Sequence, residues 1–312
     1  MHWHRNLNKN ESITVCRRIA LGLTALLFWV GCPQKDPQDL FRFGVDQSLA
    51  ELKLGEYLKV AFETHEKKRV RLVYGSSSDL AQAALAGELD SLLLESESSI
   101  ASFEAEGIPI RVAPFAHEEF IFIGPFKDYV GRYREGSGHE VLAAIARTNF
   151  RYLRARKGSA ERTRHEELFK ATRDRVEPTS FMESPLSGLE LVNAALDDQS
   201  FALVKRSSLL LARSQGRVVH RIYKAGDSEL VLRLVAVEVH PAKTKRPRRP
   251  ELFDFLMGTE GQKLIEDFGR EQFGVPVFVR GAPEEGKGAE VPLPKDWERP
   301  PAPVLLGGAK LE

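Results

Sequence analysis

Short apolar segments alternate with stretches of helical periodicity along most of the chain, and this alternation limits the folds that it can adopt. Segments 41–45, 70–74, 91–94 and 119–124 have the length and residue types of strands. Between them apolar residues recur at helical spacing, as in segment 49–62. Alternating strands and helices predict an α/β fold with mainly parallel sheets that helices cover on both faces.

The same alternation continues in the second half of the chain. Segments 201–204, 218–223 and 230–239 are predicted strands. The last of them is long and apolar, as expected of a strand that returns through the centre of a sheet.

The last helices precede a segment of different composition. Helices are predicted over 251–257 and 260–268, and Thr259 and Gln262 have the spacing of a capping box. From 280 to 312 the chain is rich in proline and glycine and shows little periodicity. This composition predicts an extended or disordered tail.

The N-terminal segment indicates export. An apolar run, 19–31, follows two arginines and ends at Cys32, and it is shorter than the roughly 20 residues that span a bilayer. Gly31 and Cys32 resemble the end of a bacterial lipobox, which predicts a signal peptide over 1–32 and a lipidated Cys32 followed by a tether over 33–40. Trp29 stands where that pattern usually has leucine, so a simple cleaved signal peptide, or a short anchor, is the alternative.

Composition excludes several classes of function. The 312 residues include 45 basic and 44 acidic side chains, so net charge favours neither nucleic acid nor broad membrane binding. Cys16 and Cys32 are the only cysteines, and both lie in the predicted leader or at its end. The mature body would therefore contain no thiol for catalysis and no cysteine ligand for zinc.

Sequence motifs of common enzymes are absent as well. The chain has no Gly-x-Ser-x-Gly elbow, no His-Glu-x-x-His and no phosphate loop that ends in Gly-Lys-Ser/Thr. We therefore expect no catalytic residues, no metal site and no cofactor, although an exported enzyme remains a third hypothesis.

Several motifs resemble those of ABC-transporter substrate-binding proteins. The run Phe-Leu-Met-Gly-Thr-Glu-Gly-Gln within 253–269, followed by Gly-Val-Pro-Val-Phe at 274–278, resembles their late helices and the strand after them. Within this family the tungstate-binding type is the most similar. Its hinge strand resembles Glu-Glu-Phe-Ile-Phe-Ile-Gly-Pro at 118–125, and another of its motifs resembles Gly-Glu-Leu-Asp at 87–90. The resemblance covers about 41–278.

The resemblance implies a two-lobed periplasmic-binding-protein-like type II fold. Each lobe would be a mainly parallel sheet flanked by helices, and two crossover strands would form the hinge. Lobe one would comprise 41–121 plus 232–279, and lobe two 122–231. In such proteins the lobes close over a ligand in the cleft, which is a hinge motion.

The function implied is capture of a small oxyanion, tungstate or a related one, for an ABC permease. The protein would be a monomer, lipid-anchored at the cell membrane in the periplasm or another extracytoplasmic space, and would bind no nucleic acid. The alternative is a non-transport binding module or sensor that keeps the fold with a degenerate ligand site.

Four loops at strand-to-helix junctions are candidates for the anion site. A desolvated oxyanion needs hydrogen-bond donors from helix N-termini, hydroxyls and arginine. Matched to the family pattern, these loops contribute Ser48, Ser76, Ser77, Ser78, Arg156, Lys157, Thr163, Arg206, Ser207 and Ser208.

Each of these residues also has an ordinary structural interpretation. The serines at 76–78 can cap a helix, the basic loop around Lys157 can be solvated, and Arg206 can be a structural arginine. Arg206 is the strongest single candidate. Two neighbours depart from the family pattern: Asp46 would repel an anion unless it is turned away or paired, and Lys205 replaces an aspartate.

Overall fold

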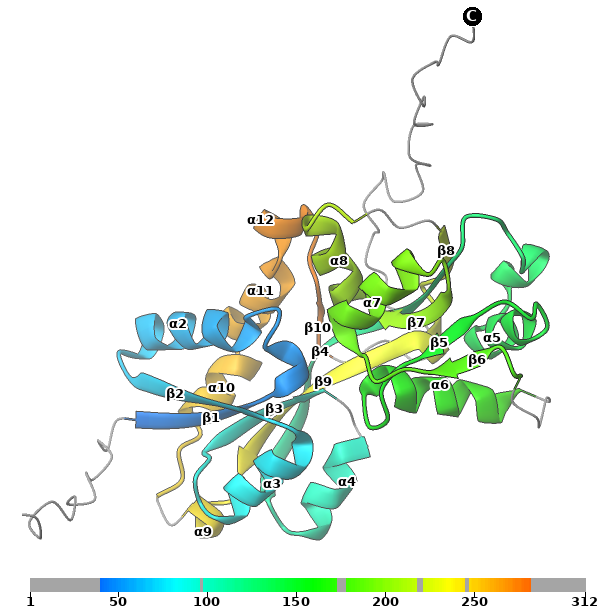
Figure 1. Cartoon of the computed structure of the whole chain (residues 1–312). Helices are drawn as coiled ribbons and strands as arrows, with labels where there is room; N and C mark the ends of the chain where they lie inside the picture. Colours follow the sequence, from blue (N-terminus) through cyan, green and yellow to red (C-terminus); the bar gives the residue numbers. More distant parts are fainter. Residues whose placement is uncertain (1–39, 96–97, 173–177, 218–220, 245–246, 282–312) are drawn as a thin grey trace, which may run out of the picture. The chain divides into compact units, whose positions relative to one another are not determined.

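The computed structural model describes residues 40–95, 98–172, 178–217, 221–244 and 247–281 (Figure 1). The predicted signal peptide with Cys32, the tether up to residue 39 and the tail from 282 lie outside the described residues. Contacts between Cα atoms separate Met1–Leu40 from Phe41–Glu312, and the elements described below lie in the second unit apart from Leu40, the first residue of β1. No helix in the described ranges has the length and apolar character needed to cross a bilayer.

Strands and helices alternate in the order that the sequence predicts. The first part of the chain contains β1 (Leu40–Asp46), η1 (Gln47–Leu49), α2 (Leu54–Glu66), β2 (Arg69–Gly75), α3 (Ser77–Leu85), β3 (Ser91–Glu95), α4 (Ser98–Ala105) and β4 (Pro109–Gly124). The middle part contains η2 (Gly131–Glu135), α5 (Gly138–Ala146), β5 (Tyr152–Arg154), α6 (Ala160–Ala171), β6 (Phe181–Glu183), α7 (Gly188–Asp197), β7 (Phe201–Lys205) and α8 (Arg206–Ser214). The last part contains β8 (Arg221–Lys224), η3 (Ser228–Leu230), β9 (Val231–Val239), α9 (Pro241–Thr244), α10 (Glu251–Met257), α11 (Thr259–Asp267), α12 (Arg270–Phe273) and β10 (Val279–Arg280).

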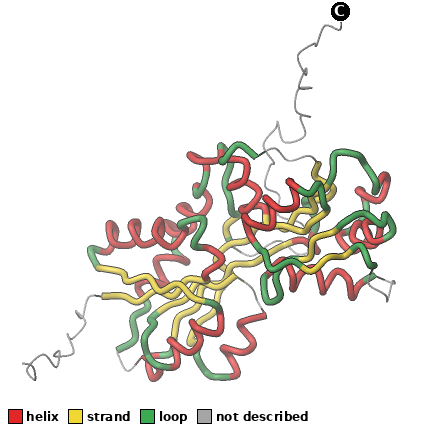
Figure 2. The backbone as a smooth tube through the Cα atoms, viewed as in Figure 1, coloured by secondary structure: helices red, strands yellow, loops and turns green. Residues whose placement is uncertain are grey.

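Two long strands, β4 and β9, connect the two groups of strands. The strand order is β2-β1-β3-β9-β4-β7-β5-β6, and β8 and β10 also pair with β4. Strand β4 pairs with β9 from Pro109 to Glu119, then with β7 from Phe120 and with β8 from Phe122. Figure 2 shows the strands passing through the middle of the molecule. We call the group around β1, β2 and β3 the first lobe and the group around β5 to β8 the second lobe.

The sheet is mixed in direction. Parallel pairs join β1 to β3 and join β5 to both β6 and β7, which are strands separated by helices, as the alternation predicts. The pairs that involve β4 or β9 are antiparallel, because each of these strands returns through the sheet between neighbours of opposite direction. The expectation of mainly parallel sheets therefore holds only away from the crossover strands.

Side chains of strand β4 pack into apolar cores on both faces of the sheet. Ile121 and Ile123 lie in the largest apolar cluster, whereas Phe120 and Phe122 lie in the separate core of the second lobe. Successive side chains of a strand point to opposite faces, which explains this division. A strand that is buried on both faces reads as a continuous apolar run, as segment 120–123 does.

The junction of α10 and α11 explains the Gly-Thr-Glu-Gly-Gln motif. A Cβ added to Gly261 would clash with the carbonyl oxygens of Phe255 and Leu256, so only glycine allows the two helices to come this close. The side chain of Gln262 donates from Nε2 to the carbonyls of Phe115, at 3.2 Å, and Leu256, at 3.1 Å. The predicted capping box is wrong, because the N-cap is Gly258 and Gln262 makes these bonds instead.

Candidate functional site

A cavity of about 360 Å³ lies between the two lobes, where strands β1, β3 and β7 end and helices α3, α6 and α7 begin. Ligands of open α/β sheets bind at the carboxyl ends of strands, so this is the expected place for a site. The lining residues are Asp46, Gln47, Ser48, Glu51, Ser76, Ser77, Glu95, Arg156, Gly158, Ser159, Ala160, Glu161, Thr163, Ser187, Gly188, Glu190 and Lys205.

Three helix N-termini reach this cavity, and a serine is the N-cap residue of each. Ser76 caps α3 and forms a capping box with Asp79, and the hydroxyl of Ser159 accepts from the backbone N–H of Arg162 in α6. Ser187 precedes α7, and its hydroxyl forms no hydrogen bond within the described residues. Helix N-termini carry partial positive charge and unpaired N–H groups, so the arrangement favours negatively charged ligand groups.

Asp46 is paired, as binding of an anion would require. Its carboxylate accepts hydrogen bonds from the backbone N–H of Ser48 at 3.0 Å and from the Ser48 hydroxyl at 2.8 Å. The hydroxyl of Ser77 donates to the other carboxylate oxygen at 3.3 Å. Donors of two predicted ligand residues are therefore used by the protein's own carboxylate.

A buried ion pair joins the two lobes at this cavity. Lys205, at the end of β7, donates to Glu95, at the end of β3, over 2.8 Å, and both side chains are almost fully buried. Burial raises the pKa of Glu95 to about 7 despite Lys205, and the charges of Glu118, Asp46 and Glu161 add to the shift. Burial would lower the pKa of Lys205, but Glu95, Glu161 and Glu118 together raise it.

The carboxylate of Glu161, a residue in the first turn of α6, binds the start of another helix, α7. Glu161 is 3% exposed, and its Oε1 accepts from the backbone N–H of Gly188, the first residue of α7, at 3.0 Å. A carboxylate at this position stabilises the helix N-terminus much as a bound anion would. Its second oxygen, Oε2, has no hydrogen-bond partner among the residues that the structure describes.

Exposed charges line the edge of the cavity. Arg156, Glu51 and Glu190 are exposed there, and within the described ranges none of the three side chains forms a hydrogen bond or an ion pair. The guanidinium of Arg156 is thus available to a ligand, and its planar fork suits an oxyanion. No group of three or more His, Cys, Asp or Glu side chains in the described part of the chain could hold a metal ion.

The structure brings five of the ten predicted ligand residues to the cavity and places five elsewhere. Those that line it are Ser48, Ser76, Ser77, Arg156 and Thr163, and those that do not are Ser78, Lys157, Arg206, Ser207 and Ser208. Ser78 and Lys157 are exposed outside the lining, whereas the last three are buried.

Arg206, the strongest sequence candidate, has a different environment from the one expected. Its side chain is 0% exposed, and Nη1 donates to the carbonyl oxygens of Pro276, at 2.7 Å, and Val277, at 3.1 Å. Ser207 donates from its backbone N–H and its hydroxyl to Glu118 at 2.9 and 3.0 Å. These contacts hold the start of α8 against β4 and the segment before β10, and Arg206 and Ser207 do not line the cavity.

The cavity residues that sequence reasoning did not predict include Ser159, Ser187, Glu95 and Glu161. Ser159 and Ser187 each precede a helix, and this N-cap pattern could have identified them. Glu95 ends a buried strand and Glu161 lies in the first turn of α6, but nothing local indicates that either faces the cavity. Their position depends on how the two lobes pack.

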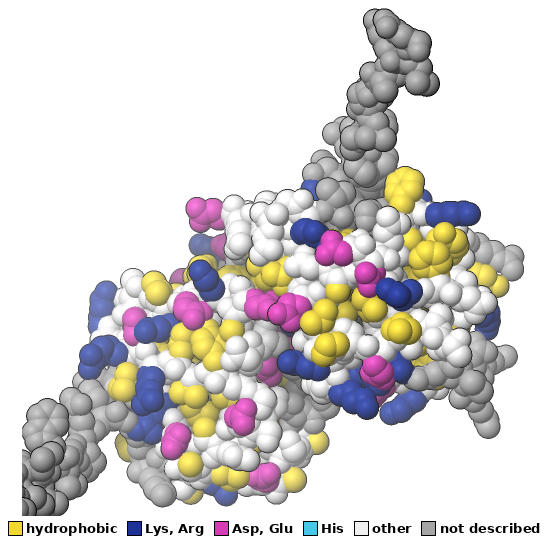
Figure 3. Space-filling model, in the orientation of Figure 1, with side chains coloured by type: hydrophobic (Ala, Val, Ile, Leu, Met, Phe, Trp, Pro, Cys, Tyr) yellow, Lys and Arg dark blue, Asp and Glu magenta, His cyan; other side chains and the backbone are white. Residues whose placement is uncertain are grey.

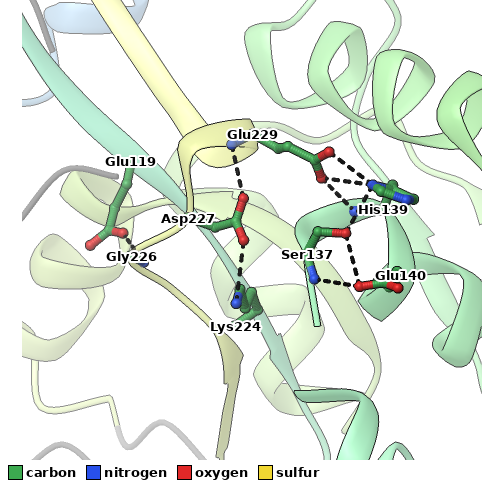
Figure 4. Close-up of polar contacts among 8 residues, drawn as sticks. All are labelled: Glu119, Ser137, His139, Glu140, Lys224, Gly226, Asp227 and Glu229. Atoms are coloured by element: carbon green, nitrogen blue, oxygen red, sulfur yellow. Dashed lines mark hydrogen bonds and ion pairs between the residues drawn. The ribbon is translucent and has the colours of Figure 1, made fainter. Parts of the chain in front are cut away.

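A second polar cluster lies near the hinge and lacks the geometry of a catalytic triad. Figure 4 shows Ser137, His139 and Glu229 together, at the N-terminus of α5. The hydroxyl of Ser137 lies 2.9 Å from Nδ1 of His139, and Glu229 Oε1 lies 2.8 Å from the same nitrogen. In a triad the acid and the nucleophile contact different ring nitrogens. The cluster instead caps α5, since Glu229 also accepts from the backbone N–H of His139.

Comparison with known proteins supports the resemblance seen in the sequence. No family model matches the chain. The tungstate-binding protein TupA of Peptoclostridium acidaminophilum is 21% identical over 243 residues, which cover 75% of this chain and 83% of that protein.

Two solved structures resemble this chain more strongly in fold than in sequence. The tungstate-binding protein TupA from Desulfovibrio alaskensis G20 superposes with a TM-score of 0.70 at 17% identity, over 78% of this chain and 99% of that one. The tungstate ABC transporter structure from Geobacter sulfurreducens superposes with a TM-score of 0.63 at 18% identity, over 75% and 100%. The chain has the two-lobed periplasmic-binding-protein-like type II fold. The predicted fold class and the predicted resemblance to tungstate-binding proteins are both confirmed, and β4 and β9 are the predicted crossover strands.

Proposed function

We propose that this protein is an extracytoplasmic solute-binding protein that captures a small oxyanion in the cavity between its lobes. The observation that supports this most directly is the convergence of three serine-capped helix N-termini and the available guanidinium of Arg156 on one cavity. The fold adds support, since the relatives and solved structures that match it include tungstate-binding proteins.

The remaining parts of the proposal concern location and partners. We propose lipid anchoring through Cys32, which becomes the new N-terminus when the segment before it is removed, with a tether up to residue 39 and a tail after Gly281, because Leu40 and Arg280 belong to β1 and β10. We also propose that the protein delivers the ligand to an ABC permease as a monomer. We also propose lobe boundaries at 41–121 plus 232–279 and at 122–231. The exchange of β4 partners between Glu119 and Phe120, and the start of β9 at Val231, support these boundaries.

One observation favours the second candidate, a binding module or sensor whose ligand site is degenerate. Asp46 uses the donors of Ser48 and Ser77, Glu161 uses that of Gly188, and Glu95 pairs with Lys205. A ligand must compete with these internal carboxylates or fit beside them.

Isothermal titration calorimetry tests the proposal. The folded mature protein is titrated with phosphate, sulfate, molybdate and tungstate, and we expect saturable binding of at least one. Arg156→Ala should weaken that binding by about tenfold or more, because a hydrogen bond to a charged group is lost. If a protein shown to be folded by circular dichroism binds none of the four, the oxyanion proposal fails and the second candidate gains support.

A further inference from the structure

Carboxylates outnumber cations in the lining of the cavity. Five of the lining residues are acidic, namely Asp46, Glu51, Glu95, Glu161 and Glu190, and two are basic, namely Arg156 and Lys205. Acidic side chains gather near the middle of the face that Figure 3 shows.

Three buried or half-buried carboxylates, those of Asp46, Glu95 and Glu161, line the cavity together with one buried ammonium group, that of Lys205. Lys205 interacts with Glu95 directly and with Glu161 electrostatically, and Asp46 acts on Glu95 through its charge. Glu118, on the neighbouring strand β4, adds a further negative charge that acts on both members of the pair. Burial raises the pKa of Glu95 and Glu118, but even without these two groups the carboxylates of Asp46 and Glu161 outnumber the ammonium group of Lys205 among the cavity residues.

This arrangement discriminates between two kinds of oxyanion. Sulfate, molybdate and tungstate are fully deprotonated at about pH 7, so they offer acceptors only and repel ionised carboxylates, which are also acceptors only. Phosphate still carries at least one proton near neutral pH, because only its second ionisation lies close to neutrality and its third lies far above it. A phosphonate, whose second ionisation also lies close to neutrality, is partly protonated there. Such a proton can be donated to a carboxylate, which turns a repulsion into a charge-assisted hydrogen bond.

We infer that the oxyanion bound here is one that carries its own proton, of the hydrogenphosphate or phosphonate class, and that the carboxylates of the cavity exclude fully deprotonated tetrahedral dianions. This inference rests on the proposed function and names its substrate class. The unprotonated oxygens of the ligand would face the helix N-termini and Arg156, and the protonated oxygen would face a carboxylate.

Glu161 is the carboxylate best placed to accept that proton. It lines the cavity and is 3% exposed, and its Oε1 is used by Gly188 while Oε2 has no hydrogen-bond partner within the described residues. Asp46 is less suited, since Ser48 and Ser77 already donate to its two oxygens. Glu95 is less suited as well, since it is held by Lys205.

A comparison of anions of similar size tests the inference. Calorimetry at about pH 7 should show phosphate bound at least about tenfold more tightly than sulfate, and also more tightly than tungstate. Sulfate or tungstate bound as tightly as phosphate would overturn the inference and leave the proposed function intact. No binding of any of these anions to the folded protein would overturn both.

A variant of Glu161 separates its role from the general charge of the cavity. Glu161→Gln keeps an oxygen that can accept from Gly188 but replaces the second acceptor with an amide donor. We expect phosphate to bind more weakly and sulfate more tightly, so that the ratio of their affinities falls by about tenfold or more. Glu104→Gln, on the exposed surface of α4, is the matched control and should leave the ratio unchanged. An unchanged ratio in folded Glu161→Gln would contradict the role of Glu161.

Discussion

Arg156 and Arg206 have similar positions in the sequence but different environments in the structure. Arg156 and Arg206 both follow the end of a strand and precede or begin a helix, so local pattern cannot distinguish them. Arg156 is exposed at the edge of the cavity, whereas Arg206 is fully buried and holds the carbonyls of Pro276 and Val277. The burial of Arg206 depends on contacts with residues about 70 positions away in the chain.

Replacement of these arginines should separate stability from binding. Arg206→Met leaves two carbonyls without their donor and leaves buried Glu119, 3.9 Å away, without its nearby cation, so the free energy of unfolding should fall by about 3–5 kcal/mol. Arg156→Met should change that free energy by no more than about 0.5 kcal/mol but should weaken oxyanion binding. Urea unfolding and calorimetry measure the two effects. A stable Arg206→Met that has lost binding would return Arg206 to the ligand site.

At the scale of elements, the contact between α10 and α11 shows what a sequence motif encodes physically. Gly261 allows the helices to touch, and Gln262 joins them to β4 through the carbonyl of Phe115. The α3 N-terminus is a second case, because the predicted cap is confirmed, with Ser76 and Asp79 forming a reciprocal capping box. Both features position elements that border the core or the cavity.

Substitution of Gly261 should be costly although it adds only a methyl group. In Gly261→Ala the new Cβ would meet the backbone carbonyls of Phe255 and Leu256, which cannot move without displacing α10. We expect the free energy of unfolding to fall by about 1–3 kcal/mol, as for overpacked cores. Lys263→Ala, exposed on the same helix, is the control and should change it by about 0.5 kcal/mol or less. Equal urea midpoints for the two variants would contradict the close approach of the helices.

At the scale of the whole molecule, buried glutamates concentrate where the two lobes meet. Glu95, Glu118 and Glu119 lie on β3 and β4, and burial raises the pKa of each, to about 7 for Glu95 and Glu119. Because the folded state binds these protons more tightly than the unfolded state, their contribution to stability is complete below the ordinary pKa of 4.5 and is lost as pH rises through about 7. Buried His165, whose pKa burial lowers to about 3, acts in the opposite direction over part of this range.

The variant Glu95→Gln isolates one of these groups. Relative to wild type it should gain stability as pH rises from about 5 to about 8, by up to about 3 kcal/mol, because it has no carboxyl to ionise. The effect of His165 is common to both proteins and cancels in the comparison. Urea unfolding at the two pH values measures the difference, and Glu104→Gln should parallel wild type. A constant difference between Glu95→Gln and wild type would refute the raised pKa of Glu95.

The sequence predicted the fold more fully than the ligand site, because some features depend on neighbouring residues and others depend on residues far apart in the chain. The strand 119–124 and the helix that Ser76 caps are encoded by neighbours in sequence, and the structure contains both. Half of the predicted ligand residues line the cavity, and these lie in the loops after strands or in the first turn of the helix that follows. Arg206 and Ser207 do not, because the start of α8 turns its polar groups toward Glu118 and the segment before β10.

Sequence by itself determined the alternation of strands and helices, the family resemblance and the presence of serines at helix starts, because each depends on residues close together in the chain. Tertiary structure alone decided which charges face the cavity. Asp46, Glu95, Glu161 and Lys205 come from β1, β3, α6 and β7, and they meet only because β4 and β9 bring the two lobes together. Their mutual charges, and hence the oxyanion that we expect to bind, arise from that assembly.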